Sequence, residues 1–246
     1  DWVHRQYFDV LLSNIREQNA QVSICSYKMI DQVTDDTELS SADIACRVIT
    51  HAQLAEKDIP SWGRLYHRDS IGNTRFDRSI TLAEDTVFNL EVIRRHPQLR
   101  LICCDAQIYN YFTRQDSLVH TLPNKEFAPL IRYYLGCIRC FGDRDVENVC
   151  LIRACKTMFL WRYRTMFQKD PEGNALLRQL LKQARTELRK ADGISIKNKA
   201  FYLTLAHFPI VYRLLRIISD PTMLGWEKQQ RQKDRSFCRI FILPPG

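Results

Sequence analysis

Residues 83–112 read AEDTVFNLEVIRRHPQLRLICCDAQIYNYF and contain the clearest change of pattern in the chain. Apolar side chains recur at helical spacing over 83–96, which predicts a helix there. Pro97 ends that helix, because the residue before a proline disfavours the helical conformation. The apolar runs 99–105 and 108–112 follow at once and are typical of strands. A helix that leads directly into strands indicates an α/β layer.

The same alternation extends towards the N-terminus. Apolar periodicity predicts helices at 2–19 and 42–56, and the run VSICSY predicts a buried strand at 22–27. The acidic and polar segment 31–41 is expected to be a loop. Residues 1–122 are therefore expected to form an α/β domain.

Beyond Pro123 the strand signals disappear, and the remainder is expected to be an all-helical extension over 123–246. Helical periodicity predicts four helices, at 126–141, 146–168, 171–190 and 196–218. The third begins with Asp170 as a capping residue and Pro171 in its first turn. Its apolar face consists of Leu177, Leu180, Leu181, Ala184 and Leu188. A separate basic stripe consists of Arg178, Lys182, Arg185 and Arg189.

Composition excludes several classes of protein. With 45% apolar residues among 246, the chain can bury a sizeable core, so intrinsic disorder is excluded. The nine cysteines are an odd number spread through apolar runs, which favours reduced, buried thiols. The spacings Cys137-x2-Cys140 and Cys150-x4-Cys155 resemble a zinc site, but they lie in helix-like stretches without a glycine-rich knuckle or a nearby His. We therefore expect no metal site there.

Three segments, in this order, resemble bacterial family 2 glycosyltransferases. Residues 1–27 are similar to the stretch that follows the D-x-D motif of the family, where an acidic cluster leads into Trp, a helix and a strand. SWGRLYHRDSIGNTRF at 61–76 resembles the acceptor-side W-N-K-L-Y segment. Residues 83–120 resemble the E-D helix, the strand after it and the Y-x-x-R-x-x-S-x-S element. The resemblance covers residues 1 to about 122.

This resemblance implies a GT-A-like fold, of which residues 1–122 are the C-terminal, acceptor-side half. In the family, roughly the first ninety residues form the nucleotide-binding half, and its binding site is expected at the switch point of the sheet. Asp1 aligns one place beyond the Asp that usually holds the divalent metal, so the resemblance places that ligand upstream of Asp1. We expect Mn or Mg in the intact enzyme and no cofactor bound by this chain alone. The truncated chain is expected to be inactive.

Glu84 and Asp85 are the candidate catalytic residues. Inverting glycosyl transfer needs a base that takes the proton of the acceptor hydroxyl, and a carboxylate at a helix start suits that role. The family resemblance implies that Asp85 is this base. The alternative is that both acidic residues only stabilise the positive end of the helix dipole.

Four further residues are candidates for substrate binding. Trp62 and Tyr66 are aromatic residues that either stack on a sugar ring or belong to the core. Arg114 offers a fork of donors for the leaving diphosphate, and His120 offers a donor or a metal ligand. The family often has Arg where this chain has Phe112, so Arg114 either replaces that residue or is a solvated loop charge.

The charge of the chain is unevenly distributed. Residues 1–123 carry 13 Lys and Arg against 17 Asp and Glu, whereas residues 124–246 carry 23 against 11. The basic part is either a solvated helical bundle or a surface that attaches to anionic lipid. Neither a helix-turn-helix pattern nor an RNP sequence is visible, so nucleic acid is not an expected partner.

The function expected from the resemblance is transfer of a sugar from a nucleotide-sugar donor to a glycan or lipid-linked acceptor. The family places this reaction in cell-surface polysaccharide or capsule synthesis. The expected location is the cytoplasm, with attachment to the inner face of the plasma membrane as an option. The alternative function is a non-catalytic helical module that binds an acidic partner or a membrane surface.

Overall fold

A computed structural model describes residues 1–30, 38–56, 61–112, 126–165 and 170–207. The chain divides into two compact units. Unit 1 consists of residues 1–79 and 83–114, and unit 2 consists of residues 80–82 and 115–246. Unit 1 contains the sheet, and unit 2 contains the last four helices.

The sheet of unit 1 is built around one long strand, β5 (Leu101–Phe112). On one edge, β5 runs parallel to β2 (Val22–Ile30), and β2 in turn pairs with the antiparallel β4 (Arg64–Tyr66). β3 (Cys46–Ile49) and β1 (Trp2–Val3) pair with successive parts of β5, both antiparallel. The register between β2 and β5 shifts twice, between Ile24 and Tyr27, so the central pair of strands is irregular there.

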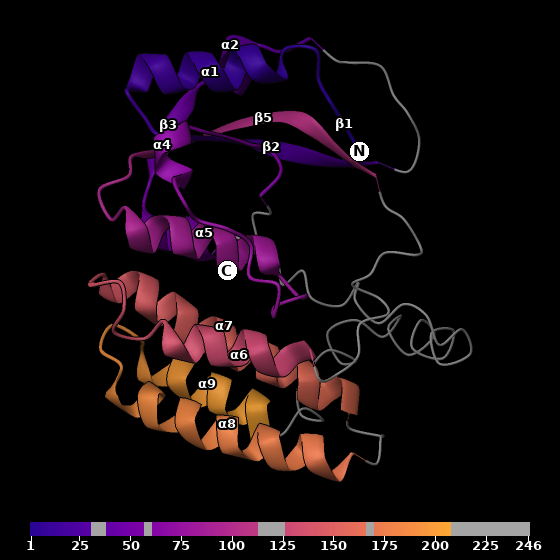
Figure 1. Ribbon diagram of the computed structural model, residues 1–246, viewed down its shortest axis with the longest axis vertical. Coiled ribbons are helices and arrows are strands. Elements are labelled where there is room, and N and C mark those ends of the chain that lie inside the picture. Colours follow the sequence, from indigo (N-terminus) through magenta and orange to yellow (C-terminus); the bar gives the residue numbers. More distant parts are fainter. Residues whose placement is uncertain (31–37, 57–60, 113–125, 166–169, 208–246) are drawn as a thin grey trace. The chain divides into compact units, whose positions relative to one another are not determined.

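Helices lie on both faces of this sheet (Figure 1). α1 (Tyr7–Gln18) packs Tyr7 and Leu11 against Cys104 and Ile108 of β5. α5 (Glu84–Arg95) lies on the opposite face and buries most of its length, including Phe88 and Val92. The predicted helix over 83–96 is thus confirmed, and the strand predicted at 22–27 forms the first part of β2.

The predicted helix over 42–56 is wrong. The chain there forms α2 (Ser41–Ile44), β3, and α3 (His51–Glu56). Ser40 and Asp43 form a capping box at the start of α2, and Thr50 and Gln53 exchange the equivalent hydrogen bonds at the start of α3. Two helix starts so close together leave the residues between them extended, and they pair with the free edge of β5.

Three other boundaries differ from expectation. The helix predicted at 2–19 begins at Tyr7, because the residues before it pair with β5 as β1. The two strands predicted at 99–105 and 108–112 are one continuous strand. Most of the loop expected at 31–41 lies outside the described residues, and its end belongs to α2.

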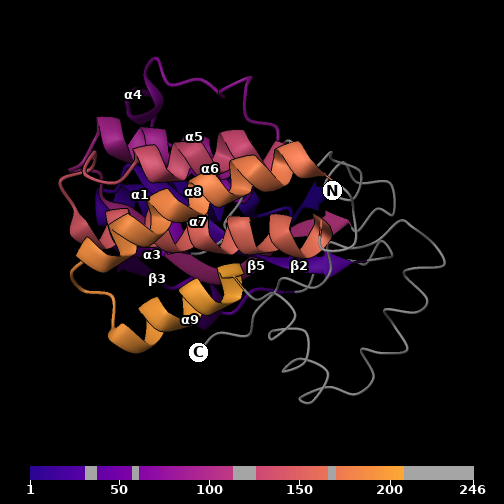
Figure 2. The same cartoon turned by 90° about the horizontal axis from the view of Figure 1, so that it is seen from below.

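Unit 2 is a helical bundle of α6 (Phe127–Gly136), α7 (Arg144–Thr165), α8 (Pro171–Lys190) and α9 (Ile196–His207). α8 and α9 form one layer of it, packed on α7 and α6 (Figure 2). α7 supplies the centre of the core, where Trp161 stacks on Phe127 at 6.4 Å between ring centroids. The helix predicted at 126–141 is shorter than expected, and the one predicted at 146–168 begins earlier, at Arg144. The ends of the predictions for 146–168 and 196–218 lie outside the described residues.

α8 agrees closely with its sequence. The Asp170 carboxylate accepts a hydrogen bond from the Gly173 N–H at 2.8 Å, as expected of a capping residue. All five residues of the predicted apolar face are buried. All four residues of the basic stripe, Arg178, Lys182, Arg185 and Arg189, are exposed.

Candidate functional site

The two candidate catalytic carboxylates occupy the first turn of α5. Glu84 is exposed and Asp85 is half-buried, and one Asp85 oxygen accepts a hydrogen bond from the Thr86 N–H at 2.7 Å. Neither carboxylate has an ion-pair partner among the residues that the structure describes. Ala83, just before the helix, adopts a left-handed conformation with φ 53°, which costs a residue other than glycine about 1 kcal/mol or more.

A chain of hydrogen bonds joins strand β4 to the same helix. An Nη atom of Arg64 donates to the Tyr66 hydroxyl at 3.4 Å, and that hydroxyl donates to Oδ1 of Asn89 at 2.5 Å. Arg64 and Tyr66 alternate along β4 and therefore project on the same face of the sheet. Asn89 lies four residues after Asp85, so the two share one face of α5.

The electrostatics connect these groups with Asp85. Burial raises the pKa of the Tyr66 hydroxyl; the Arg64 guanidinium lowers it, and the negative charge of Asp85 adds to the rise. The Asp85 carboxylate therefore lies within electrostatic reach of Tyr66. Phe88 packs its ring edge-on to Tyr66 and face-on to Phe76, which adds an apolar wall beside the polar chain.

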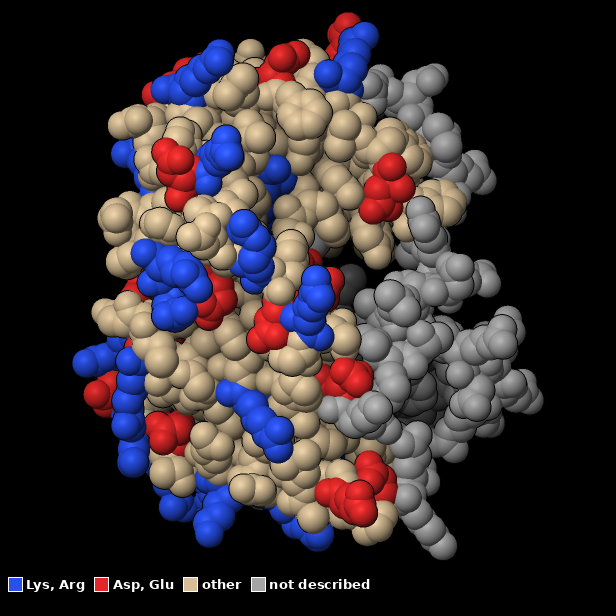
Figure 3. All heavy atoms as spheres, viewed as in Figure 1, with Lys and Arg blue, Asp and Glu red and all other residues tan. Residues whose placement is uncertain are grey.

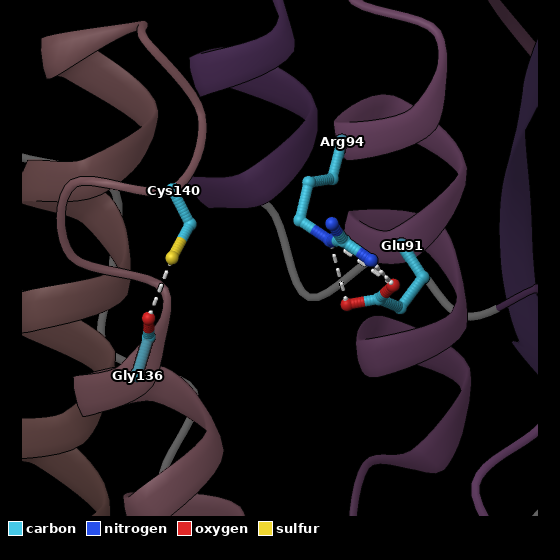
Figure 4. Close-up of polar contacts among 4 residues, drawn as sticks. All are labelled: Glu91, Arg94, Gly136 and Cys140. Atoms are coloured by element: carbon cyan, nitrogen blue, oxygen red, sulfur yellow. Dashed lines mark hydrogen bonds and ion pairs between the residues drawn. The ribbon is translucent and has the colours of Figure 1, made fainter.

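The third carboxylate of α5 is in a different state. Glu91 receives two Arg94 nitrogens, with its shortest contact at 2.6 Å (Figure 4). This forked pairing neutralises Glu91 within the helix surface. Glu91 is consequently a poor candidate for proton transfer, in contrast to Asp85.

A second cluster in unit 1 is aromatic. Trp62 stacks on Tyr109 and Tyr111, with ring centroids 4.4 Å and 5.2 Å away, and meets Tyr27 edge-on at 5.0 Å. The Asp1 carboxylate accepts hydrogen bonds from the Tyr109 hydroxyl and from a backbone N–H at the end of β5. The cluster lies towards the carboxyl ends of β2 and β5, where ligands of α/β sheets commonly bind.

The predicted site residues thus fall into separate groups. Tyr66 is brought together with Asp85, whereas the described ring contacts of Trp62 are all with the aromatic cluster. Arg114 and His120 lie outside the described residues. Sequence reasoning missed Arg64 and Asn89, although the alternation in RLY and the four-residue step from Asp85 to Asn89 were both visible signals.

The described cysteines and helices provide neither a metal site nor a membrane span. Among the described residues no group of three or more His, Cys, Asp and Glu is arranged to hold a metal ion. The eight described cysteines are not in disulfides, and Cys140 is the exposed one, its Sγ donating to the Gly136 carbonyl at 2.9 Å (Figure 4). No helix in the described ranges has the length and apolar character needed to cross a membrane.

Comparison with known proteins supports the fold. No protein-family model matches the sequence, and no curated protein matches it. The structure is similar to that of S. aureus TarS, residues 1–349 in complex with UDP-GlcNAc, with a TM-score of 0.55 and 11% sequence identity. The match covers 87% of this chain and 65% of that chain, so this chain spans less than two thirds of the TarS structure. The likeness shows the fold: a glycosyltransferase-like, partial GT-A-like α/β fold with a helical C-terminal extension, as the sequence predicts.

Proposed function

We propose that the chain is the acceptor-side part of an inverting glycosyltransferase. The enzyme would transfer a sugar from a nucleotide-sugar donor to a hydroxyl of a glycan or lipid-linked acceptor in cell-surface polysaccharide synthesis. The observation that carries the proposal is Asp85, a half-buried carboxylate without an ion-pair partner among the described residues, at the start of a helix and beside a partly buried tyrosine. The fold of TarS, solved with UDP-GlcNAc, supports a nucleotide sugar as the donor class.

The proposed step is a single displacement. The acceptor oxygen attacks the anomeric carbon, the bond from that carbon to the diphosphate oxygen breaks, and the hydroxyl proton passes to Asp85. Arg114 remains the proposed contact for the departing diphosphate, and His120 a proposed donor to it. No group of three possible ligands for the expected Mn or Mg ion lies among the described residues. No step of the proposal is therefore assigned to the ion.

The experiment compares two proteins, residues 1–246 and the product of the whole reading frame. Both are titrated with UDP-GlcNAc and with other common nucleotide sugars, and are then assayed for release of the nucleoside diphosphate in the presence of Mn²⁺ or Mg²⁺. Because the proposal gives this chain the acceptor side, residues 1–246 should neither bind the donor at micromolar concentration nor release UDP. Micromolar donor binding by residues 1–246 would contradict this division of the enzyme, and the absence of turnover from both proteins with every nucleotide sugar tested would contradict the function.

We further propose that unit 2 holds the protein on the anionic inner face of the plasma membrane. The basic stripe of α8 is exposed along its length, and Lys and Arg gather at the surface of this helix (Figure 3). On α9, Ile196 is 84% exposed and Phe201 is 43% exposed, which supplies apolar side chains for insertion. Each Lys or Arg near an anionic leaflet contributes about 1 kcal/mol.

Vesicle co-sedimentation tests the membrane proposal. The protein should bind vesicles that contain phosphatidylglycerol, should not bind pure phosphatidylcholine, and should be released by 1 M salt, where the Debye length is about 3 Å. The double variant Arg178→Glu/Arg185→Glu should lose this binding. Arg5→Glu/Arg16→Glu on unit 1 makes the same change of net charge and should retain it. Equal loss in both variants would show that binding follows net charge alone, and it would contradict a membrane-binding surface on α8.

A further inference from the structure

Asn89 is buried on α5 in a way that packing alone does not explain. The residue is 5% exposed, and its Nδ2 has no hydrogen-bond partner among the described residues. Burying an amide without a partner is unfavourable, and an apolar side chain at the same place would avoid that cost. A buried amide group that remains unpaired therefore suggests a partner from outside the protein.

The hydrogen-bond chain from β4 determines which end of the Asn89 amide is available. Arginine only donates, so the Tyr66 oxygen that accepts from Arg64 directs its own proton towards Asn89. Asn89 must meet that proton with Oδ1, which leaves Nδ2 as the unpaired group. The orientation is thus imposed by two residues of another element.

Asp85 lies one helical turn before Asn89 on the same face of α5. Side chains four residues apart on a helix have Cβ atoms about 5–6 Å from each other, so one hydroxyl oxygen can reach the polar ends of both once neighbouring side chains have moved aside. Asp85 accepts hydrogen bonds and the Asn89 Nδ2 donates them. A hydroxyl group both donates and accepts, so it matches this pair.

We propose that Asn89 binds the acceptor hydroxyl, donating from Nδ2 to its oxygen while the hydroxyl proton points at Asp85. This inference rests on the proposed function, because it names the group that Asp85 would deprotonate. Tyr66 and Arg64 are positioning residues that hold the Asn89 amide in this orientation. Nδ2 is closed to solvent in the unliganded structure, so entry of the hydroxyl requires neighbouring side chains to move. Asp85 and Tyr66 are both only partly buried, so displacement of their side chains would open a route from solvent to Nδ2.

The chain contains a matched control for this experiment. Asn14 lies on α1, is 6% exposed and has an Nδ2 without a partner among the described residues. The candidate catalytic carboxylates lie on α5 and not on α1. Asn14→Leu and Asn89→Leu therefore remove equivalent buried amides. Asn89→Ala serves as a second variant in case leucine is too large for the site.

Residues 1–246 labelled with ¹⁵N are titrated with the methyl β-glycosides of glucose, galactose and N-acetylglucosamine, and side-chain amide resonances are followed by NMR. We expect the Asn89 NH₂ pair to shift with at least one glycoside while the Asn14 pair does not move. Asn89→Leu and Asn89→Ala should weaken that glycoside about three- to tenfold, the usual effect of one hydrogen bond, and Asn14→Leu should leave its affinity unchanged.

Two results would overturn the inference: no glycoside moves the Asn89 resonances, or both Asn89 variants bind as the wild type does. Failure of the proposed function is a separate result. It would be seen if the glycoside shifts the Asn89 resonances while Asp85→Asn leaves the turnover of the product of the whole reading frame unchanged. That result would support the hydroxyl site and contradict the role of Asp85 as the base.

Discussion

The two units of the chain bury different kinds of side chains. Of the ten buried polar or charged residues that the structure describes, nine belong to unit 1, and Thr165 is the one in unit 2. Thr165 donates to the backbone of its own helix, whereas Asn89, Ser70 and Thr74 of unit 1 each contain a buried polar atom without a partner in the described ranges. In unit 2, Nε1 of Trp161 is also buried without such a partner. Unpaired buried polar atoms reduce stability, and proteins retain them mainly at functional sites. This difference favours the proposal that the chemistry belongs to unit 1, while the described interior of unit 2 is mainly apolar.

The largest effect is expected at Asp85. In the active protein, Asp85→Asn should reduce turnover by roughly 10²–10⁴-fold, the usual contribution of a positioned general base. Glu84→Gln is the matched control, because Glu84 is exposed and precedes Asp85 in the same turn. Steady-state release of UDP measures both. Full activity of Asp85→Asn together with loss in Glu84→Gln would reverse the two roles.

The second prediction contrasts the cores of the two units. Leu177 of α8 is fully buried, and Leu177→Ala should lower the free energy of unfolding by about 2–5 kcal/mol. Ser70 of unit 1 is equally inaccessible, but its hydroxyl has no described partner, so Ser70→Ala should change stability by less than about 1 kcal/mol. Urea denaturation measures both. A large loss for Ser70→Ala would show that its hydroxyl is paired and would weaken the contrast.

The third prediction concerns alkaline pH. Burial raises the pKa of the Cys104 thiol to about 11, with smaller contributions from backbone and neighbouring cysteines. Because the pKa is higher in the folded than in the unfolded state, this thiol contributes its full stability below pH 9 and loses it as the pH rises towards 11. The stability difference between wild type and Cys104→Ala should therefore shrink by on the order of 1 kcal/mol between pH 8 and pH 10. A difference independent of pH would contradict this.

The smallest effect is expected at Ala83. Glycine adopts the left-handed conformation without the steric penalty of a Cβ, so Ala83→Gly should raise the free energy of unfolding by up to about 1 kcal/mol. Ala20 is the control, because it is buried just after the C-cap of α1 and has no positive φ. Ala20→Gly should lower the free energy of unfolding. Destabilisation by Ala83→Gly would mean that its methyl group packs favourably enough to outweigh the strain.

The sequence predicted those elements whose signals are local. α8 has a capping residue, a proline in its first turn and an apolar face in perfect register, and α5 has a helical pattern ended by Pro97. β3 was missed because its pairing with β5 is long-range, while Ser40 and Thr50 were not recognised as two separate helix starts. Helical periodicity alone does not distinguish one helix from two short ones with a strand between them.

The candidate site was only partly visible for the same reason. Asp85 was chosen from the family resemblance and Tyr66 as an aromatic residue able to stack on a sugar, and the structure brings them together. Asn89 became a candidate only through its hydrogen bond with Tyr66, which is 23 residues away in the sequence and on a different element. Trp62 was a candidate for substrate binding in the same site as Asp85. Its stacking on Tyr109 and Tyr111 is a long-range contact between β5 and the segment before β4, which the sequence alone does not reveal.

The central claim, inverting transfer with Asp85 as the base, is tested most directly by following one reaction with proton NMR. The product of the whole reading frame is incubated with UDP-GlcNAc, whose sugar is α-linked, and with methyl β-N-acetylglucosaminide as acceptor. We expect a new β-linked anomeric signal that grows at the rate of UDP release and is lost in Asp85→Asn. An α-linked product, or the same β-linked product formed at the wild-type rate by Asp85→Asn, would contradict it.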